Sequence, residues 1–354
     1  MWILDLGTLA AHIRKDWKEQ VDRFMNEMRQ TAWSREHRKK PYVTAVILAV
    51  LIVAEIFILS GILGYLFGTA GVVLHEIVLA LIGVLMILIM RGRMKTAFPF
   101  RKLKWSGIFG SLILWGGILL LTSVVTLTMA YFFPDQMLNA SNGVDELMSA
   151  TPMWIDLLVV AVTPAICEEI AFRGALLTCF RGTRSKWTGI IIVGLFFGAC
   201  HGSVWRMVPT AILGLVMGYV LFETENIFYC MLIHFTNNAF SVILTNALVW
   251  LERLQGTGAQ AVDVATDRLP LASVGIYMIF ATIAPLLLYI GNYLIHRGQP
   301  GYTKVFPREK RGALWGMLGA CAVLFGCGVF LISAAVVLQV CWGKKGLPFW
   351  NELL

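Results

Sequence analysis

The chain has 354 residues, of which 58% are hydrophobic and 14% are charged. A soluble domain carries about 25% charged residues, so this composition excludes an ordinary water-soluble globular protein and indicates an integral membrane protein. The formal net charge of +8 arises mostly in loops on one side of the predicted bundle, so it reports membrane topology and not nucleic-acid binding.

Residues 1–41 precede the first apolar run and are strongly basic. They contain nine lysines and arginines, and apolar side chains such as Leu6, Ile13 and Trp17 recur at roughly helical spacing. This pattern predicts an amphipathic arm that lies on anionic lipid at the cytoplasmic face. A partly ordered basic arm without a membrane role is the alternative.

Nine apolar stretches follow the arm and predict an all-α, polytopic transmembrane bundle of about eight or nine spans. We divide the chain into the first three spans (42–135), a central core (150–250) and two C-terminal spans (271–342). The predicted spans are 42–67, 71–90, 106–133, 153–179, 187–205, 208–222, 226–250, 271–296 and 312–342.

Loop charges predict the orientation of these spans. The arm and the second, fourth and eighth loops are basic, whereas the third loop, between 134 and 152, has no lysine or arginine. Cytoplasmic loops are enriched in these residues, so we expect a cytoplasmic N-terminus, in the cell membrane if the source is prokaryotic. The acidic stretch at 223–226 and Lys344 with Lys345 fit this orientation less well.

Charged side chains inside the span 153–179 are costly there and suggest a functional site. Glu169 and Arg173 are four residues apart, share a helix face and can form an ion pair. Glu168 is rotated by about 100° from Glu169, so it can face a cavity and accept a proton there.

Two further spans carry complementary groups. Phe197 precedes His201 by four residues, and His234 precedes Asn238 by four, so each pair shares a helix face. An imidazole and an amide on one face can donate hydrogen bonds to a developing oxyanion. Counted from the predicted cytoplasmic boundary at about 1.5 Å per residue, Glu168, His201 and His234 all lie roughly 13–23 Å deep. We therefore expect them to meet near mid-membrane.

The first two spans also contain polar side chains, at Glu55, His75 and Glu76. We interpret these as groups that hydrogen-bond between helices. Such bonds contribute only about 0.6 kcal/mol each on average.

The ordered set of motifs resembles a known family. Glu168–Glu169–x–x–x–Arg173, Phe197–x–x–x–His201 and His234–x–x–x–Asn238 are similar to the motifs of the CPBP family, which is named for CAAX proteases and bacteriocin-processing enzymes. The family is also called the ABI family of intramembrane endopeptidases. The resemblance covers roughly residues 150–250.

The resemblance implies a role for each matching residue. Glu168 would be the general base that activates a water molecule, helped by His201, and Glu169 would support the site through Arg173. His234 and Asn238 would stabilise the tetrahedral oxyanion, and Phe197 would pack beside the histidine.

The metal requirement of the site has two possible answers, because the family is described both as metalloproteases and as glutamate proteases. If the site held zinc, Glu168, His201 and His234 would be its ligands, with Cys230 as a possible addition. We favour a site without a cofactor, because the chain has no His-Glu-x-x-His motif and because the amide of Asn238 suits an oxyanion better than a cation.

The sequence thus predicts an intramembrane endopeptidase that hydrolyses a membrane-associated peptide or protein with an activated water. We expect the scissile bond to arrive from the cytoplasmic side or from the lipid. The alternative is a membrane scaffold, or a proton- or cation-coupled transporter, that uses the same buried polar cluster. The expected partners are the peptide substrate and the lipid bilayer, and no nucleic acid.

Overall fold

The computed structural model describes residues 41–137, 139, 151–254, 270–307 and 311–342. All regular elements in these ranges are helices, which confirms the predicted all-α bundle. Helices are expected in lipid because they satisfy their own backbone hydrogen bonds. The predicted basic arm lies outside the described residues, except for Pro41.

Seven helices in the described residues are long and apolar enough to cross a membrane. They match seven of the predicted spans and comprise α2–η1–α3 (Pro41–Ala54, Glu55–Leu59, Ser60–Phe67), α4 (Thr69–Ile89), α6 (Trp105–Phe132), α11 (Val204–Thr224), α12 (Ile227–Leu254), α13–η4–α14 (Leu271–Phe280, Ala281–Ile283, Ala284–Ile295) and α15 (Arg311–Trp342).

The predicted span 153–179 is one continuous helical stretch whose hydrogen bonding changes along its length. It consists of α8 (Met153–Asp156), the π-helical η2 (Leu157–Val162), α9 (Thr163–Glu168) and the π-helical η3 (Glu169–Leu176). Pro164 is the second residue of α9, just after η2, and a proline inside a helix removes one backbone donor. π-helical turns are frequent at functional sites, and here they flank Glu168 and Glu169.

The predicted span 187–205 ends earlier in the structure. α10 (Lys186–Ala199) is only 14 residues long, and a turn follows in which Gly202 has a φ of 69°. Ser203 then caps α11 by accepting a hydrogen bond from the backbone of Trp205, so α11 begins at 204 and not at 208. His201 consequently lies on the turn between two antiparallel helices and not inside a span.

Glycines set the closest approaches between the core helices. A Cβ on Gly198 would lie 2.5 Å from the carbonyl oxygen of Met207, so α10 and α11 pack backbone to backbone. A Cβ on Gly83 would lie 3.1 Å from the Cα of Ala171, so α4 lies directly against η3. Small residues allow this close approach in membrane bundles.

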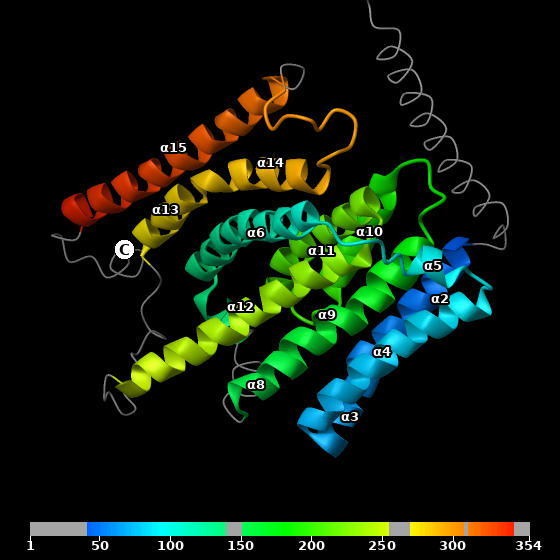
Figure 1. Cartoon of the computed structure of the whole chain (residues 1–354). Helices are drawn as coiled ribbons and strands as arrows, with labels where there is room; N and C mark the ends of the chain where they lie inside the picture. Colours follow the sequence, from blue (N-terminus) through cyan, green and yellow to red (C-terminus); the bar gives the residue numbers. More distant parts are fainter. Residues whose placement is uncertain (1–40, 138, 140–150, 255–269, 308–310, 343–354) are drawn as a thin grey trace, which may run out of the picture.

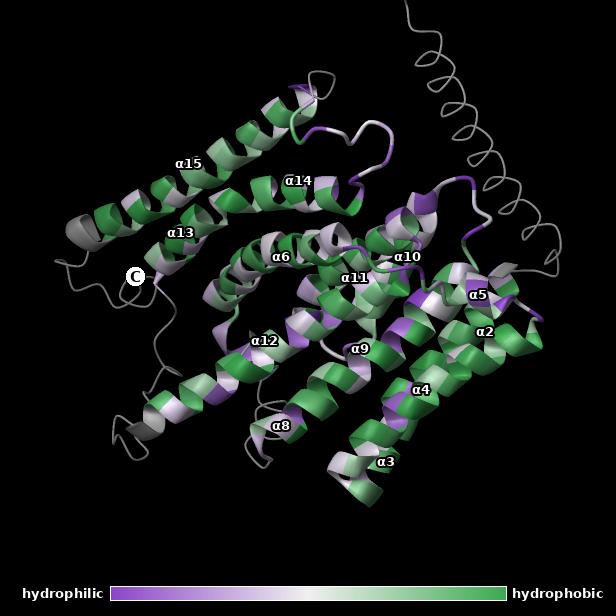
Figure 2. Cartoon of the chain, viewed as in Figure 1, coloured by the Kyte–Doolittle hydropathy of each residue, from purple (hydrophilic) through white to green (hydrophobic). Residues whose placement is uncertain are grey.

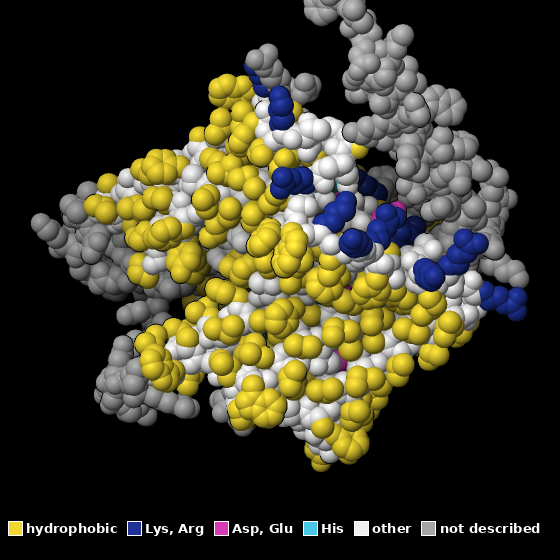
Figure 3. Space-filling view, in the orientation of Figure 1, with side chains coloured by type: hydrophobic (Ala, Val, Ile, Leu, Met, Phe, Trp, Pro, Cys, Tyr) yellow, Lys and Arg dark blue, Asp and Glu magenta, His cyan; other side chains and the backbone are white. Residues whose placement is uncertain are grey.

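The helices form two layers around the central core (Figure 1). α13, α14 and α15 lie on the outer side of α6, where α14 packs against α6 and α15 packs against α13. Hydrophobic residues cover most of the helices in Figure 2, and their side chains form the broad apolar exterior of Figure 3. This exterior is the surface that a bilayer would cover.

Candidate active site

A buried ion-pair cluster joins η3 to α12. Arg173 Nη1 and His234 Nδ1 each lie 3.0 Å from the same oxygen, Glu169 Oε1. Glu169 and Arg173 are fully buried, and His234 is 2% exposed. Because a carboxylate only accepts, Nδ1 of His234 carries the donated hydrogen, and Nε2 faces away from Glu169. The structure therefore places Glu169 beside Arg173, and it adds His234, which the sequence did not pair with Glu169.

The ring of Phe197 connects this cluster to the other histidine. The Arg173 guanidinium carbon lies 4.2 Å above the ring centroid, and the ring meets His201 and His234 edge to face at 4.9 Å and 5.8 Å. Arg173 also donates to the carbonyl oxygen of Gly214 at 3.3 Å. Phe197 thus packs beside both histidines and stabilises the buried cation through its π face.

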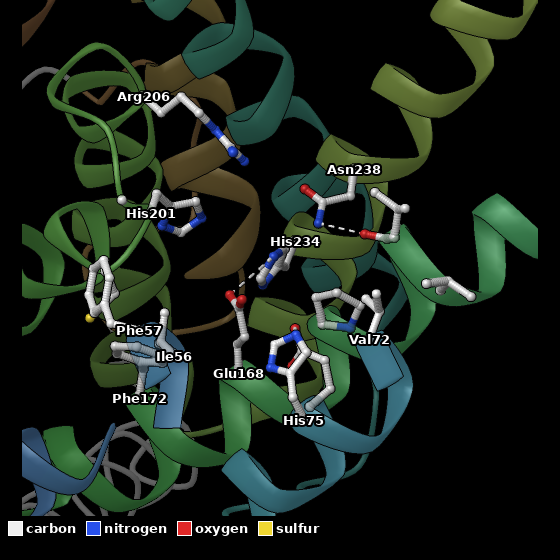
Figure 4. Close-up of a pocket in the computed structure, with 16 residues that line it drawn as sticks. Ile56, Phe57, Val72, His75, Glu168, Phe172, His201, Arg206, His234 and Asn238 are labelled. Carbon is white, nitrogen blue, oxygen red and sulfur yellow. Dashed lines mark hydrogen bonds and ion pairs between the residues drawn. The ribbon is translucent and has the colours of Figure 1, made fainter. Parts of the chain in front are cut away.

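A cavity of about 470 Å³ lies in front of the cluster, and Glu168 faces it. The Glu168 side chain is 17% exposed, and its Oε2 lies 3.8 Å from His234 Nε2. Figure 4 shows Glu168, His201 and His234 pointing toward the same space from different elements. The two adjacent glutamates thus occupy different environments: Glu169 is in a buried ion pair, and Glu168 is at the cavity.

His201 lines the same cavity from the turn after α10. Its Nδ1 lies 2.8 Å from the carbonyl oxygen of Phe197, so Nδ1 is the donor and Nε2 remains an acceptor in the neutral imidazole. The backbone bond inside the turn fixes the ring orientation. We predicted from the sequence that His201 lies within a helix. In the structure it lies on the turn after α10, and this turn directs the side chain into the cavity.

Asn238 forms two hydrogen bonds within the protein. Its Nδ2 donates to the carbonyl oxygen of Val160 at 3.0 Å, and its Oδ1 accepts from Asn237 Nδ2 at 3.3 Å. An amide nitrogen carries two hydrogens, so one remains for a ligand in the cavity. Asn238 lines the cavity, and its amide is oriented by both neighbours.

Three cavity residues were not predicted as part of the site. His75 and Glu76 of α4 line it, as does Arg206 of α11. His75 Nδ1 lies 3.4 Å from Glu55 Oε1, and His75 Nε2 lies 3.8 Å from Glu76 Oε1. From the sequence, we interpreted His75 and Glu76 as groups that hydrogen-bond between helices. Arg206 was missed because the sixth span was expected to begin after it.

The described residues include all three ligands of the zinc alternative, Glu168, His201 and His234, and these line the same cavity. No group of three His, Cys, Asp or Glu side chains among them is arranged to hold a metal ion. Glu168 Oε2 lies 3.8 Å from His234 Nε2, and Nδ1 of His201 is bonded to the Phe197 carbonyl, which leaves its Nε2 atom available. Cys230 is fully buried, its Sγ donates to Met217, and it does not line the cavity.

The comparison with protein families bears on this arrangement. Residues 150–240, which contain the motifs of α9, η3, α10 and α12, match the family described as type II CAAX prenyl endopeptidase Rce1-like. The match confirms the resemblance to CAAX proteases that the motifs indicated. The Rce1-like segment holds Glu168, Glu169, Arg173, His201 and His234, whereas His75 and Glu76 lie before it.

The match to a second protein also covers about a quarter of the chain. An uncharacterized protein of Mycoplasma capricolum subsp. capricolum is 35% identical over 100 residues, which are 27% of this chain and 29% of that protein. The chain therefore matches less than a third of the length of this curated relative. No solved structure matches the chain.

Proposed function

We propose that the chain is an intramembrane endopeptidase that hydrolyses a peptide bond of a membrane-associated peptide or protein. One observation carries the proposal: in the Rce1-like segment, Glu168 faces a cavity of about 470 Å³ with His201 and His234, while Glu169 and Arg173 form a buried pair behind it. A buried ion pair supports the walls of a site, and a carboxylate at a cavity can exchange protons with water.

Glu168 is the general base in this proposal. It takes a proton from a water molecule in the cavity, and the water oxygen forms a bond to the carbonyl carbon of the substrate. The Nε2 atoms of His201 and His234 lie at the same cavity and hold the water in line. No covalent enzyme intermediate is needed.

The oxyanion of the tetrahedral intermediate needs hydrogen-bond donors. The second hydrogen of Asn238 Nδ2 is one donor. His234 is the other when both of its ring nitrogens carry a hydrogen, the second taken up from solvent, since Nδ1 already donates to Glu169. When the carbon–nitrogen bond breaks, the protonated Glu168 returns its proton to the leaving amine, so atoms and charges balance.

The decisive experiment compares Glu168→Gln with the wild-type chain in detergent, using a quenched fluorogenic peptide that the wild type cleaves. We expect kcat/KM to fall at least about 10²-fold, because general-base catalysis contributes about 10²–10⁴-fold. Asp135→Asn, an exposed acid outside the cavity, should keep full turnover. Unchanged turnover in Glu168→Gln would refute the proposal.

A transporter or scaffold would give a different result. The carboxyl and imidazole groups of Glu55, His75 and Glu76 beside the cavity could serve proton-coupled transport. In that case, reconstituted vesicles would show proton-coupled flux, and no tested peptide would be cleaved by the wild-type chain.

The proposed mechanism uses no metal, which chelation tests separately. Dialysis against EDTA and 1,10-phenanthroline should leave the rate of peptide cleavage unchanged, because the proposed base and donors are protein side chains. A loss of activity that added zinc restores would contradict the metal-free mechanism and leave the peptidase assignment intact.

A further inference from the structure

The basic residues gather at one end of the bundle. Figure 3 shows Lys and Arg side chains concentrated on the upper right, at the helix ends near α5, α10 and α14 in Figure 1. They include Arg91, Arg101, Arg181, Lys186 and Arg297, which lie at or near the ends of α4, α6, η3, α10 and α14. The positive-inside rule makes this end cytoplasmic.

The cavity begins well below that basic end and extends away from it. At about 1.5 Å per helical residue, Glu168 lies ~12 Å from the end of η3 at Leu176, and His234 lies ~10 Å from the start of α12. Val72 and Arg206, which also line the cavity, lie ~26 Å and ~27 Å from the ends of α4 and α11 on the side of the basic loops. A hydrocarbon core is about 30 Å thick, so the cavity reaches the opposite half of the bilayer.

Packed side chains close the cavity on the basic side. All ten residues from 171 to 180 are buried, and they occupy the helix between the cavity and Arg181. The ring of Phe98 lies against Gly174, where a Cβ would come within 2.2 Å of it. The segment after Phe98 is held to α12 by the hydrogen bond from the Ile227 N–H to the Pro99 carbonyl. In the part of the chain that the structure describes, these packed side chains separate the cavity from the loop at Arg181.

The opposite side of the cavity is exposed. Three of its lining residues are exposed: Phe57, whose side chain is 52% exposed, Gly202 and Arg206. Gly202 lies in the turn between α10 and α11, and Arg206 lies in the first turn of α11. Both are at the end of this helix pair that is remote from Lys186. The floor is buried, as Phe172, Cys200 and His234 show.

We propose that the substrate reaches Glu168 from the membrane face opposite the basic loops, which is the extracytoplasmic face. The substrate class is then a peptide segment exposed outside the cytoplasm or lying in the outer half of the bilayer, and not a cytoplasmic C-terminus. This inference about substrates rests on the proposed peptidase function. The sequence led us to expect an approach from the cytoplasmic side or from the lipid, and the inference replaces the cytoplasmic alternative. The direction in which the cavity opens does not depend on that function.

Site-directed labelling tests the orientation of the cavity mouth in intact producing cells. In a chain whose seven cysteines are replaced, Val204→Cys places a thiol next to Gly202, where the native side chain is 70% exposed, and Lys102→Cys is the matched control on the basic side. A membrane-impermeant maleimide should modify Val204→Cys without permeabilisation and Lys102→Cys only after it. The reverse pattern would overturn the proposal.

A second measurement uses the wild-type chain in sealed vesicles, so it does not depend on the cysteine-free variant. Trypsin cleavage at the loop of Arg181 and Arg184 gives the fraction of chains with outward basic loops. A charged, impermeant fluorogenic peptide is then added outside the vesicles. Its rate of cleavage should rise with the fraction of chains whose basic loops are protected from trypsin. A rate that rises with the fraction of chains whose basic loops are exposed overturns the inferred route.

A peptide library that the chain does not cleave in detergent would instead refute the peptidase function. The labelling result, which reports only the orientation of the cavity mouth, would stand.

Discussion

At the residue scale, the two neighbouring glutamates have opposite surroundings. Glu169 is fully buried between Arg173 and His234, whereas Glu168 reaches the cavity. Removing one partner of a buried ion pair leaves an uncompensated charge and typically costs about 3–5 kcal/mol. Removing a carboxyl charge at a water-filled cavity has no such cost. The same chemical change should therefore have different effects at the two positions.

We expect Arg173→Met to lower the stability of the folded chain by about 3–5 kcal/mol, because Glu169 would then be buried without its guanidinium. Glu168→Gln should leave the midpoint of thermal unfolding in detergent close to that of the wild type. Differential scanning fluorimetry of the two variants measures the contrast. Equal midpoints for Arg173→Met and the wild type would contradict a structural role for the buried pair.

At the element scale, the α10–α11 hairpin positions His201. The two helices meet through Gly198 and Gly214, whose added Cβ atoms would lie 2.5 Å from the Met207 oxygen and 3.0 Å from the Gly194 oxygen. The tight packing brings the turn at Gly202 over the cavity. His201 is then oriented by its bond to the Phe197 carbonyl, so the separation of the helices controls the catalytic geometry.

Gly198→Ala should force α10 and α11 apart, since the new methyl group meets backbone and not a flexible side chain. We expect a loss of about 1–3 kcal/mol in stability and a drop in turnover as His201 moves. Gly316→Ala on α15 is the matched control, because a Cβ there has no neighbour within 4 Å. The measurements are thermal unfolding and peptide cleavage, and wild-type behaviour of Gly198→Ala would disprove the packing argument.

At the scale of the whole molecule, the cavity is built without the last helices. Its lining residues come from η1, α4, the η2–α9–η3 stretch, the turn before α11, α11 itself and α12. α15 packs on α13 and α14 and contributes none of them. The C-terminal hairpin therefore covers α6 on the side of the bundle away from the site.

A chain that ends after residue 303, and so lacks α15, should retain most of its peptide cleavage in detergent. The physical reason is that α13 and α14 remain packed on α6, while every lining residue of the cavity is still present. Circular dichroism controls for folding. A folded truncated chain without turnover would show that α15 contributes to the site.

The sequence by itself determined the all-α class, the approximate spans and the residues of the Rce1-like motifs. These features are local: hydropathy over about 20 residues predicts a span, and a spacing of four places Glu169 beside Arg173. Residues 150–240, which carry these motifs, match the Rce1-like family model.

Only the tertiary structure decided which groups meet across helices. His234 pairs with Glu169, His75 and Glu76 of α4 join the cavity, and Arg206 lies at its mouth. These contacts depend on glycine-mediated helix packing, on the π-helical turns around Glu168 and on the turn at Gly202, none of which a hydropathy pattern encodes. The opening of the cavity is likewise a property of packing, because it depends on which end of the bundle large side chains fill.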